Sequence, residues 1–372
     1  MKKYIAYVIC ILTFAFVISW GVKKTNTSAQ LNETTHNYPL SPIQLIGKNI
    51  FFDPSLSNPF GQSCASCHNP SVAFTDSTHV AFSLGAIKEL HGTRNTPSIS
   101  YSTFSPYLFF DSINETYVGG LFWDGRANTL AKQAEGPLLN HLEMNNQNKS
   151  LIVQKVKSSN YSKLFMSVFG PSIFNNTENA FNAILESIEE YEESREANPF
   201  SSKYDCYLAG KASLTEQEAR GLKLFNDPQK GNCAACHPSA PDKITGVVLF
   251  TDFTYDNIGV PGNENNPDLG LGKIVNDKKA NGMFRVPSLR NVAKTAPYFH
   301  NGSIKTLEDA VSFYNERDNG KFGKPECVEN INTEELGNLK LNAQEIKDIV
   351  AFLYTLTDLR FPEKAISSFS SK

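Results

Sequence analysis

Two short cysteine motifs carry the clearest chemistry in this chain. They read Cys-Ala-Ser-Cys-His at residues 64–68 and Cys-Ala-Ala-Cys-His at residues 233–237. C-x-x-C-H is the attachment signal of a c-type haem, in which two thiols bond to the vinyl groups and the adjacent histidine becomes the proximal iron ligand. The motifs therefore predict two covalently bound haem c groups, and the residues that hold them are Cys64, Cys67, His68, Cys233, Cys236 and His237.

Other uses of paired cysteines fit this pattern less well. A thioredoxin-like dithiol has one motif between a strand and a helix, and zinc sites usually pair C-x-x-C units without a fixed adjacent histidine. The chain has seven cysteines and seven histidines in 372 residues. Scattered at random, these would produce about 0.002 C-x-x-C-H motifs per chain. Two motifs therefore indicate haem attachment.

A helix is expected before each motif. Ser41 and Pro42 form a helix start, and Thr215 with Glu218 forms a capping box. Both helices should stop at an Asp-Pro pair. The two segments superimpose at one constant offset, with Gly47, Phe51, Asp53 and Pro54 matching Gly221, Phe225, Asp227 and Pro228.

Each half also ends in a segment with helical spacing of apolar residues, over 181–191 and 346–353. Alternating strand patterns are scarce. We therefore predict an all-α protein of two tandem cytochrome c-like domains, a duplication rather than a solenoid. The expected bounds are 41–198 and 199–372, joined near residues 197–202.

Composition excludes several classes of protein. Hydrophobic residues make up 40% of the chain, which excludes wholesale disorder. The 35 lysines and arginines are offset by 38 acidic residues, so we expect no nucleic-acid partner. Lys2 and Lys3 precede an uncharged apolar stretch over 4–22, which predicts a signal peptide or an N-terminal membrane anchor within residues 1–29. A linker over 30–40 follows, and the rest of the chain is expected in the periplasm.

Beyond the haem motifs, residues 41–357 resemble the bacterial dihaem cytochrome c peroxidase family, including its MauG branch of maturation enzymes. The resemblance rests on spaced signatures in both halves. These are Arg94-Asn95-Thr96-Pro97, Phe122-Trp123-Asp124-Gly125-Arg126, Gln133, Pro137, Glu143, Pro287-Ser288-Leu289-Arg290-Asn291, Thr295-Ala296-Pro297-Tyr298-Phe299-His300 and the stretch 306–314.

The resemblance implies an open iron in the first domain, which would hold the peroxidatic haem. Classical members carry a histidine about 16 residues past the first motif as sixth ligand, and Ala86 stands there in this chain. Alanine cannot bind iron. His79 and His91 lie nearby and are the alternative ligands, although a loop histidine is more often solvated or hydrogen-bonded.

For the second, electron-transfer haem, the resemblance places Tyr314 opposite His237. Classical peroxidases usually carry methionine there, whereas the MauG branch carries tyrosine, which stabilises ferric iron. Met283 is the competing ligand, and a tyrosine packed in the core is the other interpretation of Tyr314.

The resemblance also assigns residues around the haems. Glu143 matches the catalytic glutamate and Gln133 the pocket glutamine, while Trp123 matches a residue between the haems that relays electrons. Asn95, Thr295 and Pro297 match positions that bind a calcium ion. By residue type alone, Glu143 would be a solvent-facing residue, Trp123 a core residue, and Asn95 and Thr295 turn or cap residues.

These features together predict an exported peroxidase. It would reduce hydrogen peroxide with electrons from a small cytochrome c or cupredoxin, and the homodimer common in the family is expected. One alternative is a MauG-like oxidase that acts on a protein side chain, and another is a non-enzymatic electron-transfer cytochrome. Export would permit a disulfide between Cys206 and Cys327, with free thiols in apolar surroundings as the alternative.

Overall fold

The first half of the chain is organised around two helices that cross at a glycine. The computed structural model describes residues 38–243 and 245–360, so the predicted export segment lies outside the described residues. Helix α1 spans Pro42–Phe51 and begins at Ser41, as predicted. It packs on α6, Thr177–Glu193. A Cβ atom on Gly47 would lie only 1.7 Å from the carbonyl oxygen of Ser187, so glycine allows the close approach.

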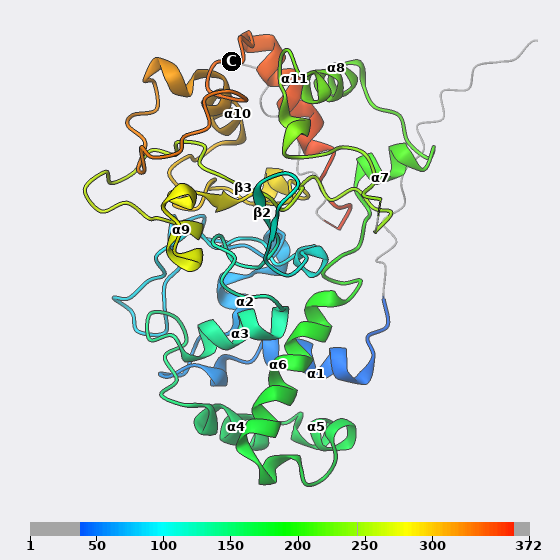
Figure 1. Cartoon of the computed structure of the whole chain (residues 1–372). Coiled ribbons are helices and arrows are strands. Elements are labelled where there is room, and N and C mark those ends of the chain that lie inside the picture. Colours follow the sequence, from blue (N-terminus) through cyan, green and yellow to red (C-terminus); the bar gives the residue numbers. More distant parts are fainter. Residues whose placement is uncertain (1–37, 244, 361–372) are drawn as a thin grey trace, which may run out of the picture. The chain divides into compact units, whose positions relative to one another are not determined.

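The second half repeats this arrangement. Helix α8 spans Glu216–Asn226 and begins with the predicted capping box. Helix α11 spans Ala343–Tyr354 and begins with a capping box of Asn342 and Glu345. A Cβ atom on Gly221 would lie 1.9 Å from the carbonyl oxygen of Asp348. Figure 1 shows α8 and α11 side by side. The duplication predicted from the sequence is therefore present in the packing of the helices.

Shorter elements complete the described residues. The other α-helices are α2 (Cys64–Cys67), α3 (Leu130–Leu139), α4 (Lys149–Lys157), α5 (Ser162–Phe169), α7 (Lys203–Leu208), α9 (Leu271–Val275) and α10 (Leu307–Glu316). Two antiparallel pairs of strands are formed by β1 (Phe109–Asp111) with β2 (Thr116–Val118) and by β3 (Tyr255–Asp256) with β4 (Phe284–Arg285). The all-α prediction is therefore confirmed, with small ribbons added. Within the described ranges, no helix is both long and apolar enough to cross a membrane.

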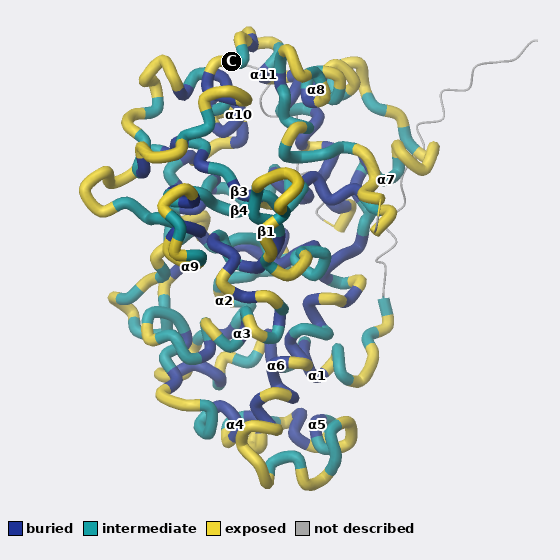
Figure 2. The backbone as a smooth tube through the Cα atoms, viewed as in Figure 1, coloured by how far each residue is buried: buried dark blue, intermediate teal, exposed yellow. Residues whose placement is uncertain are grey.

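Each half has its own apolar core. In the first, α1, α3, α4, α5 and α6 contribute most of the buried side chains. In the second, they come from α8, α10 and α11 and, in equal number, from the segments around these helices. Figure 2 shows the inner face of α6 as largely buried. These cores fix the helices, and the loops between them carry the haem motifs.

The segment predicted to join the halves is tied to both of them. Asp358, which is 1% exposed, accepts a hydrogen bond from the Tyr101 hydroxyl at 2.8 Å. It also accepts from the Ser201 amide at 3.1 Å and from Asn291 Nδ2 at 2.8 Å. One buried carboxylate therefore joins the first half, the connecting segment and the second half.

The disulfide considered for Cys206 and Cys327 is absent, and both thiols are free. Cys206 lies in α7, and its amide donates to the carbonyl oxygen of Ser202. Cys327 is buried in another loop, where its side chain packs closely against Gly282. The two cysteines are thus held by separate local contacts, and the free-thiol alternative is the correct one.

The helix crossing leads to a testable prediction. Replacing Gly47 with alanine should force α1 away from α6 and lower the free energy of unfolding by about 1–3 kcal/mol, the usual cost of overpacking. Denaturant unfolding of the haem-loaded protein measures this change. Gly92→Ala is the matched control, because a Cβ atom there meets its nearest neighbour at 3.7 Å. Equal stability of the two variants would contradict the prediction.

Candidate haem sites

The two motif histidines are held in the same way. His68 Nδ1 lies 3.1 Å from the carbonyl oxygen of Phe74, and His237 Nδ1 lies 2.8 Å from that of Phe250. A carbonyl oxygen can only accept, so each Nδ1 carries the proton and each Nε2 lone pair is left to bind a metal. Burial lowers the pKa of both imidazoles, that of His237 to about 4, so both stay neutral. Each ring is thus prepared as an iron ligand.

The loops that supply these carbonyl groups are also duplicated. Phe74 and Phe250 both have positive φ, at 58° and 54°. The Ser98 hydroxyl donates to the Ala73 carbonyl at 2.6 Å, and the Ser288 hydroxyl makes the equivalent bond to the Leu249 carbonyl at 2.6 Å. The sequence analysis missed these supporting serines. Both halves contain a Phe-Thr-Asp segment, at 74–76 and 250–252, followed by a Pro-Ser pair, at 97–98 and 287–288. The number of residues between the segment and the pair differs between the halves, so one constant offset does not align both.

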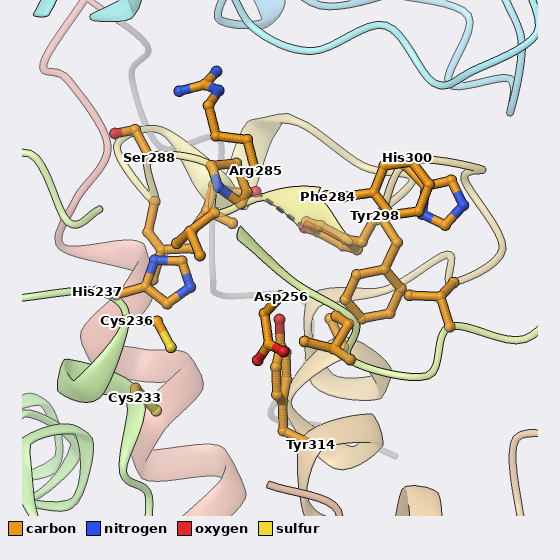
Figure 3. A pocket seen from close by; sticks show the side chains of 18 of the residues that line it. Cys233, Cys236, His237, Asp256, Phe284, Arg285, Ser288, Tyr298, His300 and Tyr314 are labelled. Carbon is orange, nitrogen blue, oxygen red and sulfur yellow. Dashed lines mark hydrogen bonds between the residues drawn. The ribbon is translucent and has the colours of Figure 1, made fainter. Parts of the chain in front are cut away.

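A cavity in the second half fits a haem c group. Cys233, Cys236 and His237 line one wall and Tyr314 of α10 lines another. Figure 3 shows the His237 ring facing into this space, with Tyr314 rising toward it from the helix. Arg285 also lines the cavity and is half-buried, and this burial lowers its pKa. Among the described residues no carboxylate forms a salt bridge with Arg285, so it suits the carboxylate groups of a haem.

Tyr314 faces the cysteines of the motif. Burial raises the pKa of its phenol, and the neighbouring Cys236 raises it further. Asp256 lies beside it (Figure 3), and burial raises the pKa of that carboxyl to about 6. Met283, the competing ligand, does not line the cavity and packs instead against the cluster that includes Leu271. The structure therefore favours Tyr314 over Met283 as the residue that faces the second haem.

In the first half, the loop that would carry a sixth ligand is packed against the Glu143 turn. The Ala86 amide donates to the carbonyl oxygen of Glu143 at 2.7 Å. A Cβ atom on Gly85 would lie 2.1 Å from the carbonyl oxygen of Leu142. This contact holds Ala86, which has no ligating group, next to the residue expected to act on peroxide.

The two alternative histidines are engaged elsewhere. His79 Nδ1 lies 2.9 Å from the carbonyl oxygen of Ala296, in the second half. His91 Nδ1 lies 2.7 Å from the carbonyl oxygen of Gly92, and its ring stacks on Phe82. Both histidines are exposed. Neither has the buried setting of His68, so the structure supports an open sixth position in the first domain.

Glu143 lies in a half-buried turn after α3 rather than on a helix. Its Oε1 accepts a hydrogen bond from Asn140 Nδ2 at 2.9 Å. Burial raises the pKa of the Glu143 carboxyl, and this bond and the charge of Arg126 oppose the rise. Gln133 lies on α3 and is half-buried, but no hydrogen bond joins it to Glu143 among the described residues. The carboxyl group is therefore placed and tuned by Asn140 and Arg126.

Trp123 connects the two halves. Its Nε1 donates to the carbonyl oxygen of Asn95 at 2.8 Å, and its own carbonyl oxygen accepts from the Arg285 amide at 2.9 Å. Trp123 also lines the second cavity. The segment that begins at Asn95 continues to Pro97, whose backbone interacts with His68. Trp123 therefore contacts residues of both halves, and its position between the two haems stays a prediction.

The three residues expected to bind calcium are found in the lining of one cavity. Asn95, Thr295 and Pro297 all line the same cavity. Asn95 is 7% exposed, and its Nδ2 donates to the Ala81 carbonyl at 3.3 Å, which leaves the amide oxygen available. Oxygen ligands of this kind suit Ca²⁺. The calcium ion itself stays a prediction.

Ion pairs reinforce the contact between the halves. Arg94 forms a bidentate pair with Asp268, with distances of 2.6 and 2.8 Å, and also contacts Asp124 at 2.6 Å. Arg126 pairs with the other oxygen of Asp124 at 2.8 Å. The sequence pointed to Arg94 and Asp124 only as parts of motifs. Their shared network could not be found without the position of Asp268.

Comparisons with known proteins agree with this arrangement. A family model described as di-haem cytochrome c peroxidase matches residues 43–213, and one described as cytochrome c matches residues 218–357. The chain is 37% identical over 349 residues to methylamine utilization protein MauG of Paracoccus denitrificans, covering 86% of this chain and 89% of that protein. It is 33% identical over 341 residues to cytochrome c551 peroxidase of Nitrosomonas europaea, covering 86% and 84%.

Solved structures show the same similarity. The dihaem peroxidase BthA from Burkholderia thailandensis superimposes with a TM-score of 0.76 and 34% sequence identity. The match covers 87% of this chain and 88% of that one. A MauG-like protein associated with microbial copper homeostasis superimposes with a TM-score of 0.68 and 32% identity, over 87% and 91% of the two chains.

The Trp123 contact leads to the second prediction. Trp123→Phe should leave the buried Asn95 carbonyl without its donor, which lowers the free energy of unfolding by about 1–3 kcal/mol. Denaturant unfolding and the rate of electron exchange between the haems are the measurements, and both should fall while the haem content is unchanged. Tyr107→Phe, at a side chain 65% exposed, is the control. A Trp123→Phe variant as stable as this control would show that the bond is not needed.

Proposed function

Because the chain belongs to the di-haem cytochrome c peroxidase family, with two covalently bound haem c groups in tandem cytochrome c-like domains, we propose that it reduces hydrogen peroxide to water. The electrons come from a small redox protein, a cytochrome c or a cupredoxin. One observation carries the proposal: the loop with Ala86 in place of a ligand is hydrogen-bonded to the turn that holds Glu143. This arrangement supports peroxide binding at the first haem, beside a carboxyl group.

The haem groups supply the redox chemistry when bound, and the chain places protons and ligands around them. His68 would hold the first haem iron through Nε2, because Nδ1 is already bonded to the Phe74 carbonyl. Ala86 offers no ligand atom, which would leave a position on that iron free for peroxide. Reduction of peroxide to water consumes two protons as well as two electrons, so a group that accepts and returns a proton is required.

Glu143 is suited to this proton transfer. Its ionised carboxyl takes a proton from one peroxide oxygen and returns it to the other. Burial raises the pKa of the carboxyl, which makes it a better base than an exposed glutamate. Asn140 holds the carboxyl in place through Oε1. His237 and Tyr314 would hold the second haem, and Trp123 would provide a path for electrons between the two haem sites.

Location and assembly are part of the proposal. The apolar segment within residues 1–29 directs export, so the protein works in the periplasm, where small electron carriers meet it. Asn95, Thr295 and Pro297 would hold a calcium ion through oxygen atoms. A homodimer remains an expectation from the family.

A second candidate function is a MauG-like oxidation of a protein side chain. Ala86 and Tyr314 favour it, because both match the MauG branch, and so does the 37% identity to a MauG protein. Peroxide reduction with a reduced cytochrome as donor separates the two functions, since a MauG-like oxidase should turn over slowly in that assay. A plain electron-transfer cytochrome is disfavoured because it has no use for Glu143 or an open iron.

The third prediction tests Glu143. Glu143→Gln should keep both haems and lose peroxide turnover by at least about 100-fold, because the amide cannot accept the proton. Steady-state peroxide reduction with a reduced small cytochrome measures the loss. Glu135→Gln is the matched control, since Glu135 lies on α3 and pairs with Lys132 and Lys149. Full activity in Glu143→Gln would refute the assignment.

The role of Glu143 also predicts how peroxide turnover changes with pH. The active form of Glu143 is ionised, and its pKa is raised, so turnover should fall as the pH drops through that raised value. The loss therefore begins at a higher pH than for an exposed glutamate. The residual activity of Glu143→Gln should not show this acid limb.

The fourth prediction tests Tyr314. Tyr314→Phe should turn the second haem from low-spin to high-spin, because phenylalanine offers no ligand atom. Absorption and electron paramagnetic resonance spectra of the ferric protein report the change. Tyr298→Phe is the control: Tyr298 lines the same cavity, but its hydroxyl donates to the Val292 carbonyl. An unchanged spectrum in Tyr314→Phe would exclude ligation.

A further inference from the structure

A buried glutamate on α6 has no part in the chemistry described so far. Glu192 is 4% exposed, and its Oε2 atom has no hydrogen-bond partner. Burying a carboxyl group without a partner is costly unless the group is neutral. A core position of this kind is usually occupied by an apolar residue. The first half therefore carries an ionisable group at a place where packing alone does not require one.

The duplication shows where Glu192 points. In the first half, Gly47 meets the Ser187 carbonyl and the Tyr191 side chain. In the second half, Gly221 meets the Asp348 carbonyl and the Phe352 side chain in the same way. The residue after each aromatic side chain is therefore equivalent, which pairs Glu192 with Leu353.

Leu353 faces the second haem site. It is 5% exposed, it lines the cavity with Cys233 and His237, and it packs in the same core cluster as Cys233. By the repeat, Glu192 holds the corresponding place against the first haem. The electrostatics agree, because after burial Glu192 is the largest cause of the raised pKa of Cys64. A carboxyl group thus replaces an apolar side chain at one haem and not at the other.

The surroundings of Glu192 favour its neutral form. Burial, together with the like charges of Glu189 and Glu193 on the same helix, raises the pKa of its carboxyl to about 8. Cys64 on α2 and the adjacent Tyr191 are the other titratable groups that interact with it. Cys64 becomes an uncharged thioether once the haem is attached. Among the described residues, no lysine or arginine is paired with the Glu192 carboxyl.

We propose that Glu192 is a redox-linked proton site of the first haem. The positive charge of the ferric haem favours the carboxylate, and reduction removes that charge and favours the carboxylic acid. Glu192 therefore binds one proton when the first haem gains one electron and releases it on oxidation. The electron comes from a one-electron donor protein or a chemical reductant, the proton comes from solvent, and the only bond formed is the carboxyl O–H bond.

This role goes beyond the proposed peroxidase function. It requires the covalent haem, and it does not require peroxide or the Glu143 chemistry. Glu192 couples each electron that enters the first domain to a proton bound on α6. The second haem lacks this coupling at the equivalent position, because Leu353 cannot bind a proton.

Spectroelectrochemical titration of the haem-loaded protein tests the proposal. The midpoint potential of the first haem should fall as the pH rises through the region around pH 8. The slope should approach the one-electron limit of about 59 mV per pH unit. Glu192→Gln and Glu192→Leu should remove this slope. The leucine variant carries the residue type that Leu353 provides at the equivalent position in the second half. The potential of the second haem should respond to pH equally in all variants.

Two control variants test whether other carboxyl groups cause the pH dependence of the potential. Glu193→Gln removes an exposed carboxylate next in sequence and should retain the slope. Glu143→Gln should lose turnover and also retain the slope, so failure of the peroxidase proposal and failure of this one are distinguishable. A slope that persists unchanged in Glu192→Gln would overturn the proposal.

A measurement on the unaltered protein covers the case in which the Glu192 variants do not fold. Infrared difference spectra between the oxidised and reduced protein should show a protonated carboxyl band that appears on reduction at pH values just below the pKa of about 8. There the charge of the ferric haem keeps the carboxyl ionised, and loss of that charge lets it bind a proton. The band should be present in Glu143→Gln as well. Its absence from both proteins would overturn the proposal without any change at Glu192.

Discussion

The hydrogen bond from each motif histidine to a backbone carbonyl is the constraint on which both haem sites depend. It fixes the proton on Nδ1 and directs Nε2 to the iron, as second-shell contacts commonly do for metal-bound histidine. The bond exists only because Phe74 and Phe250 adopt left-handed conformations in loops held by serine hydroxyls. Those loops are positioned in turn by the helix pairs that cross at glycine. The packing of the helices therefore determines, through these loops, the tautomer and orientation of the two motif histidines.

The duplicated scaffold lets a few side chains make the two sites different. The first site has Ala86 facing the Glu143 turn, and the second has Tyr314 facing the motif cysteines. Glu192 on α6 and Leu353 on α11 occupy equivalent positions and are a third such difference. Because the backbone supports are alike, each such difference acts on the haem directly and does not require a new fold. These differences are the basis for proposing reaction at the first haem and electron transfer at the second.

Contacts between the halves make them one electron-transfer unit. Trp123 bonds to Asn95 on one side and to Arg285 on the other. Arg94 and Asp358 add a bidentate ion pair and a buried carboxylate that gathers donors from both halves. Electron transfer depends steeply on separation, so a rigid interface is a functional requirement. The same contacts explain why the connecting segment is buried rather than loose.

The sequence by itself determined the haem attachment, the duplicated helices and their caps, because these depend on spacing between residues close in the chain. It also located Glu143, Trp123 and Tyr314 through resemblance. Only the tertiary structure decided the open questions that depend on distant residues. It turned His79 toward Ala296, kept Met283 out of the cavity, left Cys206 and Cys327 unpaired, and placed Glu192 in the position of Leu353. Several side chains in the sequence have the chemistry to bind iron or form a disulfide. Which of them reach a haem site depends on contacts between distant residues, and local sequence patterns do not report those contacts.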